Sequence, residues 1–183
     1  NLAVKAGEMN IRTMKLLKQA HIERFGEPTP TKVRTGTVKG HGIIITGHDM
    51  NALDKLLQQV EGTDVFVYTH SEMLPAHGYP GLRKYKNLAG NLGKAWFDQK
   101  KLFAQYPMAL LGTSNCFLPP REEYIDRMFS TGPVYLPGVK HIDGYDYSEV
   151  IARARELPEL PDAPGEYELT TGFPPSALLP HPA

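Results

Sequence analysis

The sequence has little cysteine: Cys116 is the only one among 183 residues. A single thiol excludes an internal disulfide framework, and it fits a reducing, cytoplasmic setting best. The N-terminus lacks the pattern of a signal peptide. No apolar run approaches the roughly 20 residues that a helix needs to span a bilayer. We therefore expect a cytoplasmic protein that does not cross a membrane.

Net charge is also absent, because 20 Lys and Arg residues balance 20 Asp and Glu residues. The chain has no basic run and no basic residues interleaved with aromatic ones, so nucleic acid and anionic membranes are excluded as expected partners. What the chain does have is enough length for one domain. A chain of this size buries roughly 70% of its extended surface, which is sufficient for a real core.

Helical spacing of apolar residues begins almost at the first residue. It predicts a helix over residues 2–25, with Gly26 as its C-cap and prolines shortly afterwards. The chain opens on Asn1 rather than on methionine and passes directly into this helical pattern. We therefore expect the sequence to be part of something longer.

Short β-branched apolar runs alternate with amphipathic stretches along the middle of the chain. The predicted elements are strands over 42–47, 64–69 and 108–112, and helices over 51–60, 93–105 and 148–157, the last with Ser148 as N-cap. Runs that are apolar throughout fit strands covered on both faces. The alternation predicts an α/β fold: a Rossmann-like parallel sheet flanked by helices, with an N-terminal helix.

The domain organisation follows from this pattern and from the prolines, which crowd toward the C-terminus. We expect an N-terminal helix and linker over residues 1–30, and an α/β domain over residues 31–157. Residues 158–183 carry proline after proline and are expected to form an extended or disordered tail.

Three residues with metal-binding side chains follow the three predicted strands. His48 comes after the first strand, Glu72 after the second and Cys116 after the third. In open α/β sheets, ligands bind outside the carboxyl ends of the strands. The sequence therefore predicts that an imidazole, a carboxylate and a thiol meet at the same edge of the sheet.

Each of these groups can ligate a metal. A thiolate is the usual ligand of iron in sulfur clusters, an imidazole suits iron and zinc, and a carboxylate suits harder, oxo-bridged iron. Each residue also has a commoner structural role: Cys116 as a small buried apolar residue, His48 as a cap, Glu72 as an exposed acid at the start of a helix. The residues alone therefore leave two interpretations open: the three side chains form a metal site, or each has only its structural role.

Several familiar catalytic motifs are absent. The segment from His70 to Glu72 matches the H-x-E of zinc nucleobase deaminases, but the P-C-x-x-C that those enzymes require does not occur. The chain contains no H-E-x-x-H, no P-loop and no G-x-G-x-x-G. A nucleophilic Cys–His pair has no local signature here.

Four stretches of sequence, at the predicted sheet edge and just beyond it, carry a resemblance to a known family. They are Gly47-His48-Asp49, Tyr68 through Pro80, Thr113 through Pro120, and Asp126-Arg127 with Thr131-Gly132-Pro133. They resemble the middle domain of the hybrid cluster protein family, also called the prismane or hydroxylamine reductase family. The resemblance extends from the N-terminal helix to about His141-Ile142.

This resemblance implies a set of ligands. His48, Glu72 and Cys116 match the family's histidine, glutamate and first cysteine ligands of a hybrid 4Fe-2S-2O iron–sulfur–oxo cluster. His48 and Glu72 would bind the oxo-bridged half of the cluster, and Cys116 would bind an iron through sulfur. The related carbon monoxide dehydrogenases have cysteine at the position of Glu72, which argues against a nickel–iron site.

The resemblance also implies a reductive chemistry, from hydroxylamine to ammonia and from nitric oxide to nitrous oxide. Glu72 is a candidate catalytic residue at the cluster. His77, or alternatively His70, is a candidate proton donor near neutral pH, although a hydrogen bond that stabilises the loop is the alternative role for either.

The chain departs from the family pattern in several places. The N-terminal four-cysteine motif, the further cysteine ligands and the second glutamate ligand do not occur in this sequence. Ser71 stands where the family usually has glycine, and the stretch from Thr171 to Pro175 begins like the family's next segment and then diverges. Three protein ligands are too few to enclose a multi-iron cluster. We therefore expect the isolated chain to bind no complete cluster and to be inactive.

The expected partners follow from the same resemblance. They are the cluster-binding domains of a longer parent chain, a small N–O substrate and an electron donor that the sequence does not identify. Separation from such domains should uncover apolar surface, so we expect self-association. Two alternatives remain: a stand-alone α/β interaction module, and a mononuclear zinc or Fe(II) site formed by His48, Glu72 and Cys116.

Overall fold

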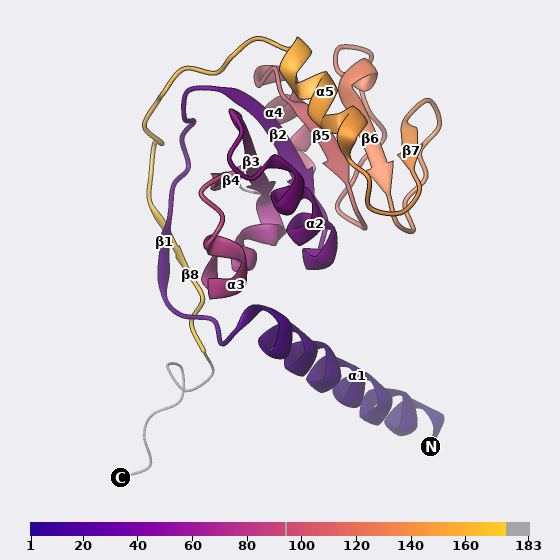
Figure 1. Cartoon of the computed structure of the whole chain (residues 1–183). Helices are drawn as coiled ribbons and strands as arrows, with labels where there is room; N and C mark the ends of the chain where they lie inside the picture. The colour runs from indigo at the N-terminus through magenta and orange to yellow at the C-terminus, as the bar shows by residue number, and fades with distance from the viewer. Residues whose placement is uncertain (94, 175–183) are drawn as a thin grey trace.

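The computed structural model describes residues 1–93 and 95–174, and Figure 1 shows their arrangement. A parallel sheet lies between helices, and a long N-terminal helix projects away from it (Figure 1). The α/β class with a parallel sheet and an N-terminal helix is therefore confirmed.

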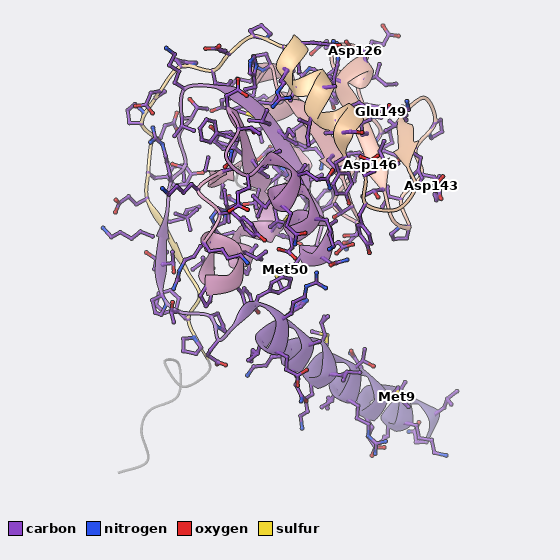
Figure 2. The ribbon with its side chains drawn as sticks, in the orientation of Figure 1. Met9, Met50, Asp126, Asp143, Asp146 and Glu149 are labelled. Atoms are coloured by element: carbon purple, nitrogen blue, oxygen red, sulfur yellow. The ribbon has the colours of Figure 1, made fainter. Side chains whose placement is uncertain are left out.

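Helix α1 spans Leu2–Phe25, as predicted. The side chain of Asn1 caps its first turn, and Gly26 ends it with φ 85° and an N–H that donates to Ile22 O at 2.8 Å. Phe25 is the one buried residue of this helix. Met9 lies on the projecting part of α1, well away from the sheet (Figure 2). No helix in the described part of the chain is long and apolar enough to cross a membrane.

The central sheet has six parallel strands. They are β2 (His41–Thr46), β3 (Val65–His70), β4 (Leu88–Leu92), β5 (Ala109–Gly112), β6 (Met128–Thr131) and β7 (Lys140–Ile142). Their order in the sheet is β4-β3-β2-β5-β6-β7. The three predicted strands are thus β2, β3 and β5, and they are neighbours within the sheet.

Both faces of the sheet are covered, as the apolar runs predict. The helices are α2 (Met50–Val60), α3 (Pro80–Arg83), α4 (Gln99–Gln105) and α5 (Ser148–Glu156), with 3-10 turns η1 (Ser71–Gly78), η2 (Trp96–Asp98) and η3 (Ile125–Arg127). Side chains of β2 alternate between two cores: Ile43 and Ile45 pack with α2 and α5, whereas Ile44 packs with Phe103 of α4. The two cores fix the sheet between its helices.

Two predicted boundaries are wrong. The helix predicted over 93–105 begins later, because Gly93 has φ 81° at the end of β4, and a 3-10 turn precedes α4. Ser148 lies inside α5 rather than capping it. The carboxylate of Asp146 accepts from the N–H of Ser148 at 3.0 Å, so the neighbouring acid binds the free backbone donor.

The described part of the proline-rich tail returns along the domain. In Figure 1 it runs from α5 to the segment beside β1. Strand β8 (Leu169–Thr171) pairs antiparallel with β1 (Thr31–Val33), and bridges join Thr37 to Ala163 and Gly40 to Leu160. These contacts hold the extended chain against the domain, and residues 175–183 lie outside the described part.

Candidate metal centre

The structure brings His48, Glu72 and Cys116 together at the carboxyl edge of the sheet. His48 Nε2 lies 2.9 Å from Glu72 Oε2, and the Cys116 thiol donates to the same oxygen over 3.4 Å. One ligand atom from each residue lies within 4.8 Å of the other two. This proximity follows from the strand order, since β3, β2 and β5 are adjacent and parallel.

His48 is positioned by a close approach between the ends of β2 and β5. Gly47 has φ 109°, and a Cβ there would lie 2.7 Å from the backbone nitrogen of Ser114, so only glycine fits. The backbone N–H of His48 donates to Ser114 Oγ at 2.8 Å. Asp49 then caps α2 by accepting from Asn51 N–H at 2.8 Å. The turn thus fixes the imidazole at the sheet edge.

Glu72 follows a left-handed turn. Ser71 has φ 50°, a conformation that glycine adopts at least cost. This backbone conformation explains why the family that the sequence resembles usually has glycine at this position. The Ser71 carbonyl accepts from the side chain of Asn91 at 3.4 Å, and Asn91 also donates to Thr69 Oγ1 at 2.9 Å. Asn91 on β4 therefore holds the turn that presents the Glu72 carboxylate.

Cys116 also has a left-handed backbone, with φ 62°. Its carbonyl accepts from Gln99 Nε2 at 2.8 Å, and Gln99 Oε1 accepts from the N–H of Leu118 at 2.8 Å. Gln99 is buried at the start of α4. One amide thus holds the loop from Cys116 to Leu118. This role of Gln99 is not visible in the sequence, because a glutamine at a helix start carries no signal of a contact with a distant loop.

The electrostatics keep the thiol protonated. Partial burial, together with the hydrogen bond to Glu72 and its negative charge, raises the pKa of Cys116 to about 11. A bound cation reverses this balance, because a coordinating thiol is deprotonated. The side chains of His48 and Glu72 are 43% and 51% exposed, so the site is open on one side.

The donor set fits iron. Nitrogen, oxygen and sulfur donors close enough to share one ion suit a centre with both soft and hard ligands. Three donors on an open edge can hold one ion or one side of a larger cluster. They leave the exposed side for ligands from elsewhere.

His70 and His77 lie beneath this edge in separate networks. His70 Nδ1 lies 2.9 Å from Thr46 Oγ1, and His77 Nε2 lies 2.9 Å from Thr69 Oγ1. Burial lowers the pKa of each to about 4, so both rings are neutral at neutral pH. Each ring therefore holds a threonine near the end of a central strand, while proton donation by His77 stays a prediction.

The fold and its edge of mixed donors define an α/β domain with a candidate metal centre. The sequence model of the Prismane/CO dehydrogenase family matches residues 1–168 of the chain. The chain therefore belongs to this family, and the resemblance seen in the sequence is confirmed. The match continues through α5 and into the returning tail, past Ile142 at the end of β7, where the sequence resemblance ended.

The curated relatives are named hydroxylamine reductase. The chain is 68% identical over 177 residues to the one from Thermotoga maritima, covering 97% of this chain and 41% of that protein. It is 60% identical to the one from Methanothermobacter thermautotrophicus, covering 98% of this chain and 42% of that protein. With the one from Geobacter metallireducens the identity is 52%, covering 97% of this chain and 32% of that protein. The chain thus spans less than half the length of the relatives it matches.

Proposed function

We propose that this chain is part of a longer hydroxylamine reductase, in which His48, Glu72 and Cys116 are ligands of an iron–sulfur–oxo cluster. The observation that carries the proposal is the meeting of three different donors within 4.8 Å at the carboxyl edge of the sheet. The identity of 68% to a hydroxylamine reductase supports the reaction. The coverage of 41% of that protein supports a longer parent that supplies the remaining ligands.

The reaction is a two-electron reduction. Hydroxylamine takes up two electrons and two protons, its N–O bond breaks, and ammonia and water leave. A bound hybrid cluster would supply the electrons, which a reducing partner protein or cofactor must replace. Nitric oxide is a second N–O substrate of the same reductive class.

The three side chains have separate tasks in this proposal. Cys116 would bind iron as a thiolate and must lose the proton that it now donates to Glu72. Glu72 would exchange its two present contacts, to His48 and to Cys116, for a metal bond. Gln99 and Asn91 keep the loops of Cys116 and Glu72 in place during this exchange.

A mononuclear site is the second candidate function. Three donors around one open position are also the make-up of a site for a single zinc or Fe(II) ion. Zinc titration of the 183-residue chain tests this candidate. One tightly bound zinc per chain, lost in His48→Ala, would favour it. Weak binding that is unchanged by His48→Ala would count against it.

The exposed apolar residues of α1 support contact with further domains of the parent. Leu2, Val4, Met9, Ile11, Met14, Leu16 and Leu17 are all exposed in this chain. We propose that the remaining domains of the longer protein cover this helix, and that the chain alone holds no complete cluster.

The experiment that tests the proposed function uses the longer reductase, purified without oxygen. We expect Cys116→Ser and Glu72→Gln to abolish the formation of ammonia from hydroxylamine. The matched control is Glu123→Gln, which makes the same change at an exposed residue. Full activity in Cys116→Ser and Glu72→Gln would overturn the proposal.

A further inference from the structure

Two exposed aromatic residues lie beside the candidate metal centre. Trp96 and Phe97 begin the turn η2, and they are 39% and 62% exposed. Their rings pack edge to face, with centroids 5.8 Å apart. Side chains of this size usually bury most of their surface, in a core or against a partner. We call these two residues the aromatic pair.

The aromatic pair is tied to the loop of Cys116. Gln99 Nε2 donates to the carbonyl of Trp96 and to the carbonyl of Cys116, each at 2.8 Å. The two carbonyl oxygens therefore share one donor, and the pair lies at the edge of the sheet that carries the candidate ligands. Because Gln99 is only 1% exposed, this connection is a fixed part of the fold.

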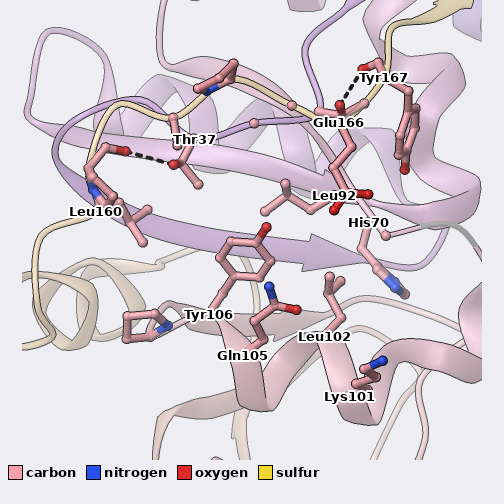
Figure 3. A pocket seen from close by; sticks show the side chains of 18 of the residues that line it. Thr37, His70, Leu92, Lys101, Leu102, Gln105, Tyr106, Leu160, Glu166 and Tyr167 are labelled. Carbon is pink, nitrogen blue, oxygen red and sulfur yellow. Dashed lines mark hydrogen bonds between the residues drawn. The ribbon is translucent and has the colours of Figure 1, made fainter.

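The nearby interior of the domain does not use the aromatic pair. A cavity of about 650 Å³ lies between α4 and the returning tail, and Figure 3 shows Leu102 on one side of it and Leu160 on the other. Ala95 and Asp98 line this cavity, but the two aromatic residues between them do not. Neither ring packs in either of the two cores of the described part of the chain. The pair is therefore free to contact another protein surface.

The metal centre beside the pair is open on one side. The side chains of His48 and Glu72 are 43% and 51% exposed, and with Cys116 they leave that side for ligands from elsewhere. The chain spans 41% of the relative from Thermotoga maritima, so more than half of that protein lies outside the matched part. An exposed apolar surface that borders an incomplete site is a natural contact for the protein surface that completes it.

We propose that the aromatic pair is the docking surface for the part of the longer protein that completes the metal centre. This inference rests on the proposed function, because that function requires further ligands from such a part. A fully covered tryptophan or phenylalanine buries about 150–250 Å², and tryptophan is enriched among the residues that dominate binding. Gln99 joins the two surfaces involved, since its amide holds both the pair and the loop that presents Cys116.

The first measurement uses the 183-residue chain and its single tryptophan. Excitation that is selective for tryptophan reports on Trp96 alone, so acrylamide quenching measures how accessible its ring is. We expect strong quenching, and the emission of an indole in contact with water, at concentrations at which the chain is monomeric. Weak quenching of the monomer would overturn the proposal, because the chain would then cover the ring by itself. Quenching that falls as the chain self-associates would assign the pair to contacts between copies and would also overturn it.

The second measurement identifies the partner surface in the proposed longer protein. Phe97→p-benzoylphenylalanine places a photoreactive group on the pair, and mass spectrometry locates the cross-link that it forms. We expect a cross-link within the same molecule to a peptide outside the 183 residues of this chain. Tyr135→p-benzoylphenylalanine is the matched control and should not cross-link to that peptide. Tyr135 is 67% exposed, but it lies between β6 and β7, at the other end of the sheet from β4, which precedes the pair.

The cross-link separates this proposal from the proposed function. No cross-link from Phe97→p-benzoylphenylalanine, or one confined to the residues of this chain or to a second molecule, would overturn the docking surface. The cross-link is read whether or not the protein is active. Its failure is therefore distinct from full activity in Cys116→Ser and Glu72→Gln, which overturns the proposed function.

Discussion

The side chain of Gln99 donates to the carbonyl of Cys116 at 2.8 Å, from a helix seventeen residues earlier in the chain. The same amide accepts from the N–H of Leu118 and donates to the carbonyl of Trp96. One buried side chain therefore binds three backbone groups, two of them in the loop of the candidate ligand Cys116. The loop that presents the thiol is held in place from α4.

The first prediction concerns Gln99. Gln99→Leu leaves the Leu118 N–H without the acceptor that it has here and removes the Nε2 donor from the carbonyls of Cys116 and Trp96, so we expect a loss of about 1–3 kcal/mol in the free energy of unfolding, and weaker metal binding. Gln99→Glu is the companion variant: it keeps the acceptor for Leu118 but turns a buried carboxylate oxygen toward the carbonyls of Cys116 and Trp96, so its loss should be larger. Urea unfolding and metal titration measure both effects. Unchanged metal affinity in Gln99→Leu would show that the loop does not need this side chain.

The second prediction concerns the left-handed turn at Ser71. Ser71→Gly should stabilise the chain by about 1 kcal/mol, because glycine adopts this conformation at lower cost. Ser71→Ala separates the backbone effect from loss of the side chain, and it should not stabilise. The midpoints of urea unfolding are compared for the unchanged chain, Ser71→Gly and Ser71→Ala. A Ser71→Gly variant less stable than Ser71→Ala would contradict the explanation.

The third prediction concerns pH. Burial lowers the pKa of His70 and His77 from 6.5 to about 4, so the unfolded chain binds more protons between these values. The stability is therefore complete above pH 6.5 and falls as the pH drops toward 4, by on the order of 3 kcal/mol for each ring. His77→Gln should remove about half of this dependence. Equal slopes in both proteins between pH 7 and pH 5 would contradict it.

The fourth prediction concerns α1. Its exposed apolar residues should cause the isolated chain to self-associate, and Ile11→Glu should weaken this association. Arg12→Gln makes the same change in net charge without removing an apolar side chain, and it should have little effect. Light scattering across a range of concentrations measures the mass. A wild-type monomer at all concentrations would refute the prediction.

The sequence predicts those parts of the fold that local pattern determines. The apolar runs of β2, β3 and β5 are visible because both faces of the central strands are buried. Strand β4 contains Gly90 and Asn91, and β7 has three residues, so neither shows such a run. Edge strands bury less and carry a weaker signal.

Some residues of the candidate site can be predicted from the sequence, and others cannot. His48, Glu72 and Cys116 can be found because each follows a visible strand. Gln99 and Asn91 cannot, because their hydrogen bonds reach loops distant in sequence. The buried Nε2 of His70, which has no hydrogen-bond partner among the described residues, is also invisible in the sequence, since its burial depends on the packing of Gly93 and Leu102.

The iron ligands that we propose can be tested most directly by an anomalous diffraction map at the iron edge, from crystals of the proposed longer protein grown without oxygen. We predict iron peaks within bonding distance of His48 Nε2, the Glu72 carboxylate and Cys116 Sγ. Iron located elsewhere, with Glu72 still hydrogen-bonded to His48 and Cys116 as in this chain, would contradict it.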